Sequence, residues 1–287
     1  MEDIVKLTIE EFPKALLEIP QPPTQLFIRG KMPPSDYVYL SVVGSRNFTT
    51  YGREICEKLI LGLKGYPIVV VSGLALGIDT IAHRAALKAG LITMSMPGSG
   101  LDNSALYPRS NIKLAQEIVD AGGCLVSEFR PDEKSHIYFF PQRNRLMAGI
   151  SKAVLIIEAQ DKSGTLITAR MAVDYNRDVL VVPGSVFSDN SKGTNNLIRQ
   201  GATPVSTSTE LLDALGFQIE KPKQTDAEKY ADCGKDEMKI LNLLNEPKER
   251  DVLTRESGMD VVKINSLLSI MEIKDLIKEE YGEIRKI

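Results

Sequence analysis

The sequence predicts an α/β protein: a doubly wound, mostly parallel sheet, followed by a small helical domain at the C-terminal end. Between about residues 36 and 216, short apolar strand candidates alternate with helical patterns. Several of these strands run directly into turns of glycine and other small residues that precede a helix. Nearly continuous apolar strands are typical of parallel sheets, because helices cover both faces of such a sheet.

Length and composition fit one large domain with a smaller one attached. The chain has 287 residues, of which 43% are hydrophobic and 25% charged, which is enough apolar material for a core of that size. No apolar run approaches the length that spans a bilayer. The acidic start, Met1-Glu2-Asp3, lacks the basic and apolar regions of a signal peptide. We therefore expect a cytoplasmic protein.

The cysteine and histidine content argues against disulfide or metal chemistry. Cys56, Cys124 and Cys233 are an odd number without paired spacing, which is typical of reduced thiols in a cytosolic protein. His83 and His136 are the only histidines, so we do not expect a histidine-based metal centre. His83 falls within a predicted helix, where we expect a packed structural role.

The first strand of the sheet leads into a candidate anion-binding turn. Residues 1–35 form a short, proline-rich segment that predicts a short helix followed by an extended strap. Residues 37–43 are β-branched and aromatic enough to form a buried strand, and Thr49 or Thr50 can cap a helix that begins near Tyr51. Between them lies Gly44-Ser45-Arg46. Such a turn gathers backbone N–H groups around an anion, and an arginine adds a bidentate grip on phosphate.

Further glycine turns follow other strand candidates and predict a phosphate-accepting rim at the carboxyl ends of the strands, where doubly wound sheets bind ligands. No G-x-G-x-x-G dinucleotide fingerprint follows the first strand, and no G-x-x-x-x-G-K-S/T nucleotide loop is present. The other strand candidates are residues 68–71, 91–95, 124–127, 154–157 and 179–182. The glycine turns are residues 72–79, 96–102, 163–165 and 182–184.

The closest grouping of aromatic and basic side chains lies in residues 139–145, Phe-Phe-Pro-Gln-Arg-Asn-Arg, at the start of a predicted helix. Aromatic rings beside Arg143 and Arg145 suit a single-stranded nucleic acid, because bases stack on rings and phosphates pair with guanidinium groups. Two alternatives stay open. In the first, one of the two phenylalanines belongs to the core instead of the binding site. In the second, one of the two arginines pairs internally with Glu128 or Glu158 instead of binding a ligand.

The sequence offers little support for catalysis. Glu158 ends a strand candidate near the turn at residues 163–165, and we favour a structural pairing of its carboxylate over a role as acid or base. No Ser-His-Asp or Cys-His set is supported, and no carboxylate cluster suggests a metal. We therefore expect no catalytic residue, no metal and no cofactor.

The chain turns polar over residues 217–235, which predicts a linker, and a compact module follows over residues 236–287. Apolar spacing predicts three helices and a terminal hairpin around Tyr281-Gly282, the pattern of a winged helix. Residues 236–287 carry a formal net charge of −3 and the rest of the chain is neutral. The third helix, residues 261–271, holds one lysine and no arginine. We expect this module to contact protein, with at most weak contacts to duplex DNA.

Taken together, the motifs resemble those of the DprA/Smf family, the bacterial DNA-processing proteins of natural transformation. The resemblance covers about residues 22–215 and then the C-terminal module. Seven motifs match in sequence order, which is far more specific than a shared fold. They are Gly44-Ser45-Arg46, Ser72-Gly73-x-Ala75-x-Gly77-x-Asp79, Gly98-x-Gly100-Leu101-Asp102 with Tyr107-Pro108, Phe140-Pro141-x-Arg143-Asn144-Arg145, Lys162-Ser163-Gly164-x-Leu166-x-Thr168-Ala169, Pro183-Gly184, and Gly193-x-Asn195-x-Leu197-Ile198-x-x-Gly201-Ala202.

The resemblance implies an extended Rossmann-like domain over residues 36–216 that binds single-stranded DNA and forms a homodimer. It also implies that the protein protects incoming strands and helps to load the RecA recombinase onto them, without catalytic activity. Two departures stand out: only a short segment precedes Pro22, and Ile137 and Tyr138 occupy the place where some members have a lysine. The family's strand-binding groove corresponds here to Gly44, Ser45, Arg46, Phe140, Arg143, Asn144, Arg145, Lys162, Ser163 and Gly164.

Two other functions stay open from the residues. One is an enzyme, a nucleotide-processing relative of the phosphoribohydrolases, which would use Glu158 to cleave a glycosidic bond. Against it, the Gly-Gly-x-Gly-Thr loop of those enzymes is incomplete here. The other is a transcription factor with a ligand-sensing core, and the scarcity of basic residues in the third helix of the C-terminal module argues against it.

Overall fold

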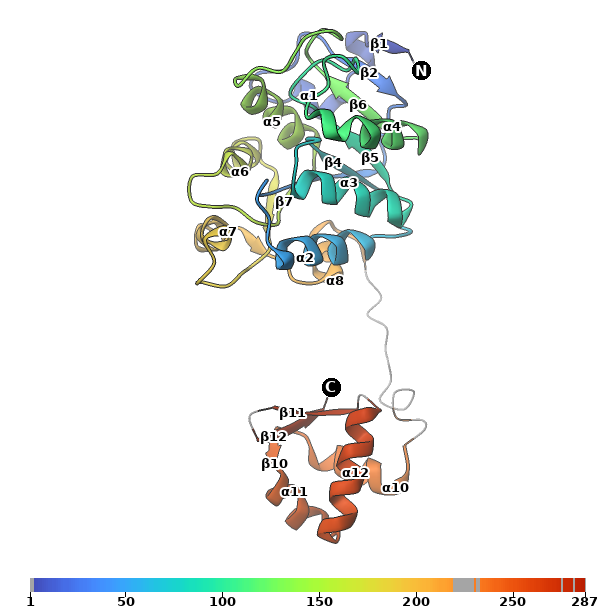
Figure 1. The fold of residues 1–287 in the computed structure, drawn as a ribbon, viewed down its shortest axis with the longest axis vertical. Coiled ribbons are helices and arrows are strands. Elements are labelled where there is room, and N and C mark those ends of the chain that lie inside the picture. Colours follow the sequence, from blue (N-terminus) through green and yellow to red (C-terminus); the bar gives the residue numbers. More distant parts are fainter. Residues whose placement is uncertain (1–2, 219–229, 231–232, 275, 281, 287) are drawn as a thin grey trace. The chain divides into compact units, whose positions relative to one another are not determined.

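The computed structural model describes residues 3–218, 230, 233–274, 276–280 and 282–286. The chain forms two compact units, Met1–Ile219 and Glu220–Ile287. Figure 1 shows the larger unit as helices packed around a twisted sheet and the smaller unit as a helical body with a small sheet. Most of the predicted linker at residues 217–235 lies outside the described residues.

One sheet organises the described part of the larger unit, in the order β1-β2-β6-β5-β4-β3-β7-β8-β9. Neighbours from β6 to β9 pair in parallel, and β2 pairs antiparallel with both β1 and β6. The chain starts the parallel part at β3 and extends it first to one side and then to the other, so a topological switch point lies between β3 and β7. The strands are β1 (Ile4–Lys6), β2 (Phe27–Gly30), β3 (Val38–Val43), β4 (Ile68–Ser72), β5 (Ile92–Ser95), β6 (Cys124–Ser127), β7 (Ala153–Ile156), β8 (Asp178–Val181) and β9 (Thr203–Pro204).

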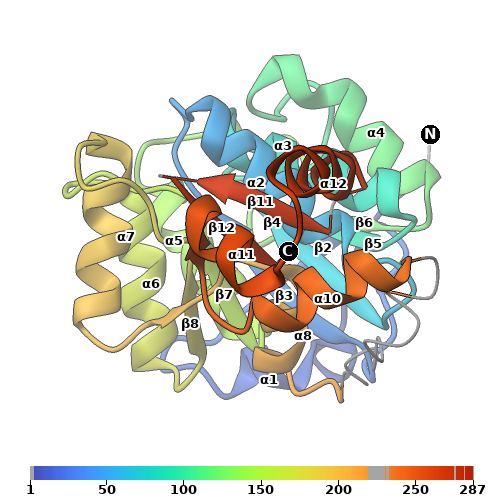
Figure 2. The ribbon, with the colours of Figure 1, turned by 90° about the horizontal axis from the view of Figure 1, so that it is seen from below.

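Helices cover both faces of this sheet. Successive residues of a strand point to opposite faces, so Leu40 and Val42 of β3 join a core with α2, α3 and α8, whereas Val43 joins a core with α1, α5 and α6. Figures 1 and 2 show α2, α3 and α4 side by side along one face. The helices are η1 (Ile9–Glu11), α1 (Lys14–Leu17), α2 (Thr50–Leu61), α3 (Ile78–Ala89), η2 (Arg109–Asn111), α4 (Ile112–Asp120), α5 (Phe139–Ile150), α6 (Gly164–Asp174), α7 (Asp189–Arg199) and α8 (Ser208–Ala214). Among the helices of the described residues, none has the length and apolarity required to cross a membrane.

The predicted fold class, a mostly parallel α/β sheet covered by helices, is confirmed. Each strand expected between residues 37 and 182 is present within one or two residues of its predicted bounds. The N-terminal segment differs from the expected helix and strap, because β2 lies antiparallel against β6 with Phe27 opposite Ser127. This strand is difficult to predict from the sequence, because prolines at positions 20, 22 and 23 precede it closely. By pairing with β6, it covers a sheet edge that would otherwise be open.

The smaller unit has the arrangement of a winged helix. Its described strands form an antiparallel sheet in the order β10-β12-β11, and Ile240, Leu253, Ile264 and Leu268 are central to its apolar core. The predicted hairpin pairs as expected, although Asp275 and Tyr281 lie outside the described residues. The elements are α10 (Lys235–Leu243), β10 (Lys248–Glu249), α11 (Arg250–Ser257), α12 (Val261–Ile273), β11 (Ile277–Glu280) and β12 (Glu283–Lys286).

Candidate functional site

A pocket of about 330 Å³ lies at the topological switch point, beyond the carboxyl ends of β3 and β7. A doubly wound sheet leaves room for a ligand here, because the connections from the two strands turn to opposite faces. Four segments form the walls: the turn after β3, the start of α3, the start of α5 and the start of α6. The lining residues are Val43, Gly44, Ser45, Arg46, Asn47, Ala75, Asp79, Phe140, Pro141, Arg143, Asn144, Met147, Gln160, Ser163, Gly164, Thr165, Ile167 and Thr168.

The turn after β3 places Arg46 at the pocket. The Ser45 hydroxyl accepts a hydrogen bond from the Asn47 N–H at 3.1 Å, and the Ser45 carbonyl accepts one from the N–H of Ile78 in α3 at 3.2 Å. The Arg46 side chain is exposed, and its guanidinium carbon lies 5.4 Å from the centre of the Phe140 ring, a cation–π distance. Over the described residues, Arg46 forms no ion pair with a carboxylate. Its charge is therefore available to a bound anion.

Phe140 provides an aromatic surface at the start of α5. The ring of Tyr107 lies 5.9 Å away, centre to centre. A side-chain carbon at position 98 would come within 2.6 Å of the Phe140 ring, so Gly98 makes room for this ring. Phe139 stacks on Phe129 with 3.8 Å between ring centres and does not line the pocket. One phenylalanine of the pair thus belongs to internal packing and the other to the pocket.

Arg143 is buried at the base of the pocket. Its guanidinium donates to the Met96 carbonyl and lies against Gly73, where any side-chain carbon would collide with it. Burial lowers the pKa of Arg143 to about 10, and the charge of Asp79 opposes this shift. Burial likewise raises the pKa of Asp79, against the effect of Arg143. The Asp79 carboxylate accepts hydrogen bonds from the N–H groups of Gly73 and Ala75 at 3.1 and 3.4 Å. The pocket floor therefore holds one cation and one anion whose charges offset each other.

The start of α6 forms the opposite wall. The Ser163 hydroxyl accepts a hydrogen bond from the Thr165 N–H at 3.1 Å and caps the helix. Nothing lies within 4 Å of the position that a side-chain carbon would take at Gly164, so a ligand can approach this backbone closely. Lys162 is exposed beside the turn but does not line the pocket. The N-terminus of an 11-residue helix adds a favourable field for an anion.

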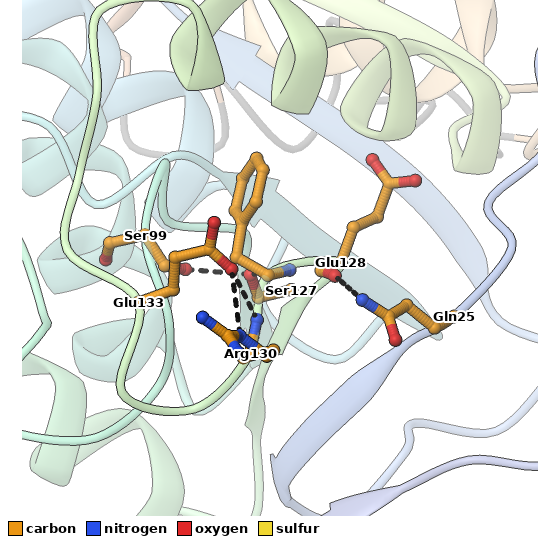
Figure 3. A network of polar contacts seen from close by, with 7 residues as sticks. Gln25, Ser99, Ser127, Glu128, Arg130 and Glu133 are labelled. Atoms are coloured by element: carbon orange, nitrogen blue, oxygen red, sulfur yellow. Dashed lines mark hydrogen bonds and ion pairs between the residues drawn. The ribbon is translucent and has the colours of Figure 1, made fainter.

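Arg145 points away from this pocket. Its Nη1 donates to the Gln21 carbonyl at 2.5 Å, and its Nη2 forms a buried ion pair with the Glu128 carboxylate. Arg143 and Arg145 are separated by about 200° around the helix, so only one can face the pocket. Figure 3 shows Glu128 in the loop after β6, where Gln25 donates to the Glu128 carbonyl at 2.9 Å. The prediction that Arg145 lies in the strand-binding groove is therefore wrong, because this arginine forms an internal ion pair.

The structure brings eight of the ten predicted site residues to one pocket and leaves Lys162 at its border. Sequence reasoning left several of the lining residues, such as Asp79, Gln160 and Thr168, out of the site. Asp79 and Thr168 stand in the motifs that carry the family resemblance, which was a usable signal. Gln160 stands in none of them, and only the fold shows where it lies. The eight residues are Gly44, Ser45, Arg46, Phe140, Arg143, Asn144, Ser163 and Gly164.

Glu158 lies outside the pocket and supports the start of α2. Its carboxylate is buried and accepts hydrogen bonds from the Thr49 N–H at 2.9 Å and the Thr49 hydroxyl at 2.5 Å. The same hydroxyl accepts from the Gly52 N–H at 3.1 Å and caps the helix. These contacts are the structural pairing that the sequence favoured.

His83 is also structural. It is fully buried, and its Nδ1 lies 2.7 Å from the Thr93 hydroxyl, which donates its own proton to the Val70 carbonyl. Nδ1 must therefore donate to Thr93. Burial lowers the pKa of His83 to about 3, so the ring is neutral at physiological pH.

These features define a class: an α/β protein with a Rossmann-like sheet whose switch-point pocket combines an exposed guanidinium, an aromatic ring and an open helix N-terminus. The chain belongs to the DNA recombination-mediator protein A family, whose model matches residues 3–216. The resemblance to DprA and Smf proteins seen in the motifs is thereby confirmed.

Two curated relatives show how far the similarity extends. Protein Smf of Escherichia coli is 39% identical over 214 residues, which cover 73% of this chain and 56% of that protein. DNA processing protein DprA of Streptococcus pneumoniae is 39% identical over 206 residues, or 72% of each chain. The chain thus spans little more than half of the first relative.

Two solved structures share the fold. The X-ray structure of DNA processing protein A from Streptococcus pneumoniae has a TM-score of 0.68 and 36% identity, covering 76% of this chain and 75% of that one. A structure of DNA processing protein A from Helicobacter pylori has a TM-score of 0.66 and 31% identity, covering 75% of this chain and 96% of that one. The latter structure is described in terms of its single-stranded DNA binding mode.

Proposed function

We propose that this protein binds single-stranded DNA in the switch-point pocket. The observation that carries the proposal is Arg46, exposed over the Phe140 ring and facing the open N-terminus of α6. A phosphate can pair with the guanidinium and the helix N–H groups, while a base stacks on the ring. This mode requires a base whose face is free, which a duplex does not offer. The binding mode described for the Helicobacter pylori relative supports the same substrate.

In this proposal the protein is a cytoplasmic recombination mediator without catalytic activity. It acts as a homodimer, protects incoming strands during natural transformation and helps to load the RecA recombinase. Membership of the recombination-mediator family supports this role. Because residues 1–235 carry no net charge, each site binds modestly, and several copies on one strand would supply the remaining affinity.

The alternative, an enzyme that cleaves a glycosidic bond, would need an accessible carboxylate. The Glu158 side chain is buried and accepts two hydrogen bonds from Thr49, which disfavours this alternative. Release of free base from nucleoside monophosphates by the wild-type protein, and its loss in Glu158→Gln, would establish the enzyme instead.

The proposed function is tested by fluorescence anisotropy with single- and double-stranded oligonucleotides over a series of salt concentrations. We expect preference for the single strand and a loss of about tenfold in affinity for Arg46→Ala, since a charge-assisted contact to phosphate is removed. Arg84→Ala is the matched control, because Arg84 is exposed on α3 and pairs with Glu117 at 3.6 Å. Unchanged affinity in Arg46→Ala would overturn the site. Equal affinity for the two oligonucleotides would overturn the substrate.

A further inference from the structure

The loop after β8 exposes large apolar side chains that no part of the proposed site uses. Val186 is 74% exposed and Phe187 is 94% exposed. The Phe187 N–H donates to the Ser185 hydroxyl at 3.2 Å, so a local turn holds the backbone at this position. A phenylalanine held in water at the edge of a hollow is typical of an interaction site.

A second hollow, of about 610 Å³, lies beside this loop, between the starts of α2 and α7. Tyr51 borders it and is 47% exposed, and its hydroxyl donates to the Pro183 carbonyl at 2.7 Å. This contact ties α2 to the loop that carries Phe187. The residues that line the hollow are Thr49, Tyr51, Glu158, Pro183, Gly184, Ser185, Ser188 and Ser191.

One short segment separates this hollow from the switch-point pocket. Asn47 lines the pocket and Thr49 lines the hollow. Asn190 of α7 donates to the Asn47 carbonyl at 2.7 Å and accepts from Gln160, a pocket residue, at 3.0 Å. The two cavities are therefore neighbours on one edge of the sheet, and hydrogen bonds fix the wall between them.

The chemistry of the hollow suits nucleobases better than phosphates. Residues with hydroxyl groups and the Tyr51 ring line it together with the largely buried residue Glu158, and its lining contains no lysine or arginine. Lys192, at the start of α7, pairs with Asp189 at 2.6 Å. Aromatic rings accept any base, because every base has a flat face that can stack.

We propose that Phe187 and Tyr51 form a base-stacking platform for the same DNA strand whose phosphates are bound at Arg46. The strand passes from the pocket across residues 47–49 to the platform. This inference rests on the proposed function and extends it: phosphate recognition lies at β3 and α6, and additional base recognition lies at the loop after β8. Continuity with the pocket, through Asn47 on one side and Thr49 on the other, favours this occupant over another protein.

The test uses the full-length protein and oligothymidines of about 4 and about 12 nucleotides, a range that brackets short and extended sites. We expect Phe187→Ala to weaken binding of the longer oligonucleotide about tenfold and to change binding of the shorter one by no more than about twofold. Phe187→Tyr restores the loss. The salt dependence stays unchanged in Phe187→Ala, whereas Arg46→Ala weakens both oligonucleotides and lowers the salt slope by about one. Val173→Ala, an exposed apolar side chain at the end of α6, is the control.

Several outcomes overturn the platform. One is an equal loss for both oligonucleotides in Phe187→Ala, and another is no loss for either. A change in the sedimentation of the protein alone, with unchanged affinity for the longer strand, would assign Phe187 to a contact between two copies instead. If Arg46→Ala weakens binding and Phe187→Ala does not, only the platform fails. If the wild-type protein binds neither oligonucleotide, the proposed function fails as well.

Discussion

The two units treat their charged side chains differently. In the larger unit, Arg46 faces solvent and forms no ion pair with a carboxylate of the described residues, while Asp79, Arg143 and Glu158 at the same sheet edge are buried. In the winged-helix unit, four basic side chains pair with carboxylates. The negative charge of each carboxylate weakens the attraction of its basic partner to a phosphate. These pairs are Lys248–Glu256, Arg250–Glu279, Lys263–Asp236 and Lys274–Glu237.

The function of a basic side chain therefore depends more on its position in the fold than on its residue type. Three arginines of the larger unit illustrate this. Arg46 is exposed at the pocket, Arg143 is buried beneath it, and Arg145 is buried in an ion pair. We expect nucleic-acid binding to depend on the first, pocket shape on the second and stability on the third. Four basic side chains of the winged-helix unit are already paired with carboxylates, and we expect this unit to contact protein.

The largest expected effect is on stability, from Arg145→Ala. Glu128 would be left buried without its partner, and breaking such a pair costs about 3–5 kcal/mol of unfolding free energy. Urea unfolding followed by circular dichroism measures this. Arg84→Ala, which removes an exposed pair, should cost at most about 1 kcal/mol. An Arg145→Ala protein of normal stability that lost DNA affinity would return Arg145 to the binding site.

The next effect separates the two units by charge reversal. Arg46→Glu places a carboxylate where a phosphate binds, and we expect single-strand affinity to fall about 100-fold. Lys263→Glu on α12 should change it by no more than about twofold, because that ammonium already pairs with Asp236 at 2.7 Å. Anisotropy titrations of both full-length variants provide the measurement. Similar losses in the two variants would break the comparison.

A further expected effect comes from a buried group of the larger unit, His83, and depends on pH. The pKa of His83 is about 3 in the folded protein, against 6.5 for an ordinary histidine. Between these two pH values the histidine is therefore protonated in the unfolded chain and neutral in the folded one. Folding stability therefore falls as pH drops from 6.5 toward 3, by on the order of 1 kcal/mol per pH unit from this one group. In His83→Asn, this contribution to the slope of unfolding free energy against pH should vanish. An identical slope in the variant would mean that His83 titrates normally.

The smallest expected effect is that of Lys263→Ala. Removing this exposed ion pair should leave the free energy of unfolding nearly unchanged. The slope of log affinity against log salt should stay at the wild-type value, whereas Arg46→Ala lowers it by about one. A reduced slope in Lys263→Ala would show that α12 contacts a phosphate.

Much of the fold could be predicted because its signals are local. Residues 68–71 and 179–182 are apolar runs bounded by turns, and both are strands of the buried sheet. The pairing of β2 with β6 was not predictable, because residues 27–30 form a short strand after a proline-rich stretch and find their partner about 100 residues later. Whether a segment forms a helix or a strand depends mostly on its local residues, whereas the pairing of distant strands depends on the fold of the whole chain.

The candidate site divides in the same way. Arg46 and the Ser163-Gly164 turn could be placed at the carboxyl edge, because strand ends of a parallel sheet meet there. Arg143 and Arg145 must point in different directions on one helix, but which of them faces the pocket depends on how α5 packs, and the residues alone leave this open. Likewise, the sequence predicts Gly98 as part of an anion-binding rim, whereas the fold shows that its lack of a side chain makes room for the Phe140 ring.

The most direct test of the central claim is photo-crosslinking of the full-length protein to a single strand that carries 5-bromodeoxyuridine. Mass spectrometry of the crosslinked peptides then identifies the residues in contact with bases. We predict crosslinks to Phe140, which lines the pocket, or to Tyr107, whose ring lies 5.9 Å from that of Phe140, and their loss in Arg46→Glu. Crosslinks confined to α12 of the winged-helix unit, unaffected by Arg46→Glu, would contradict it.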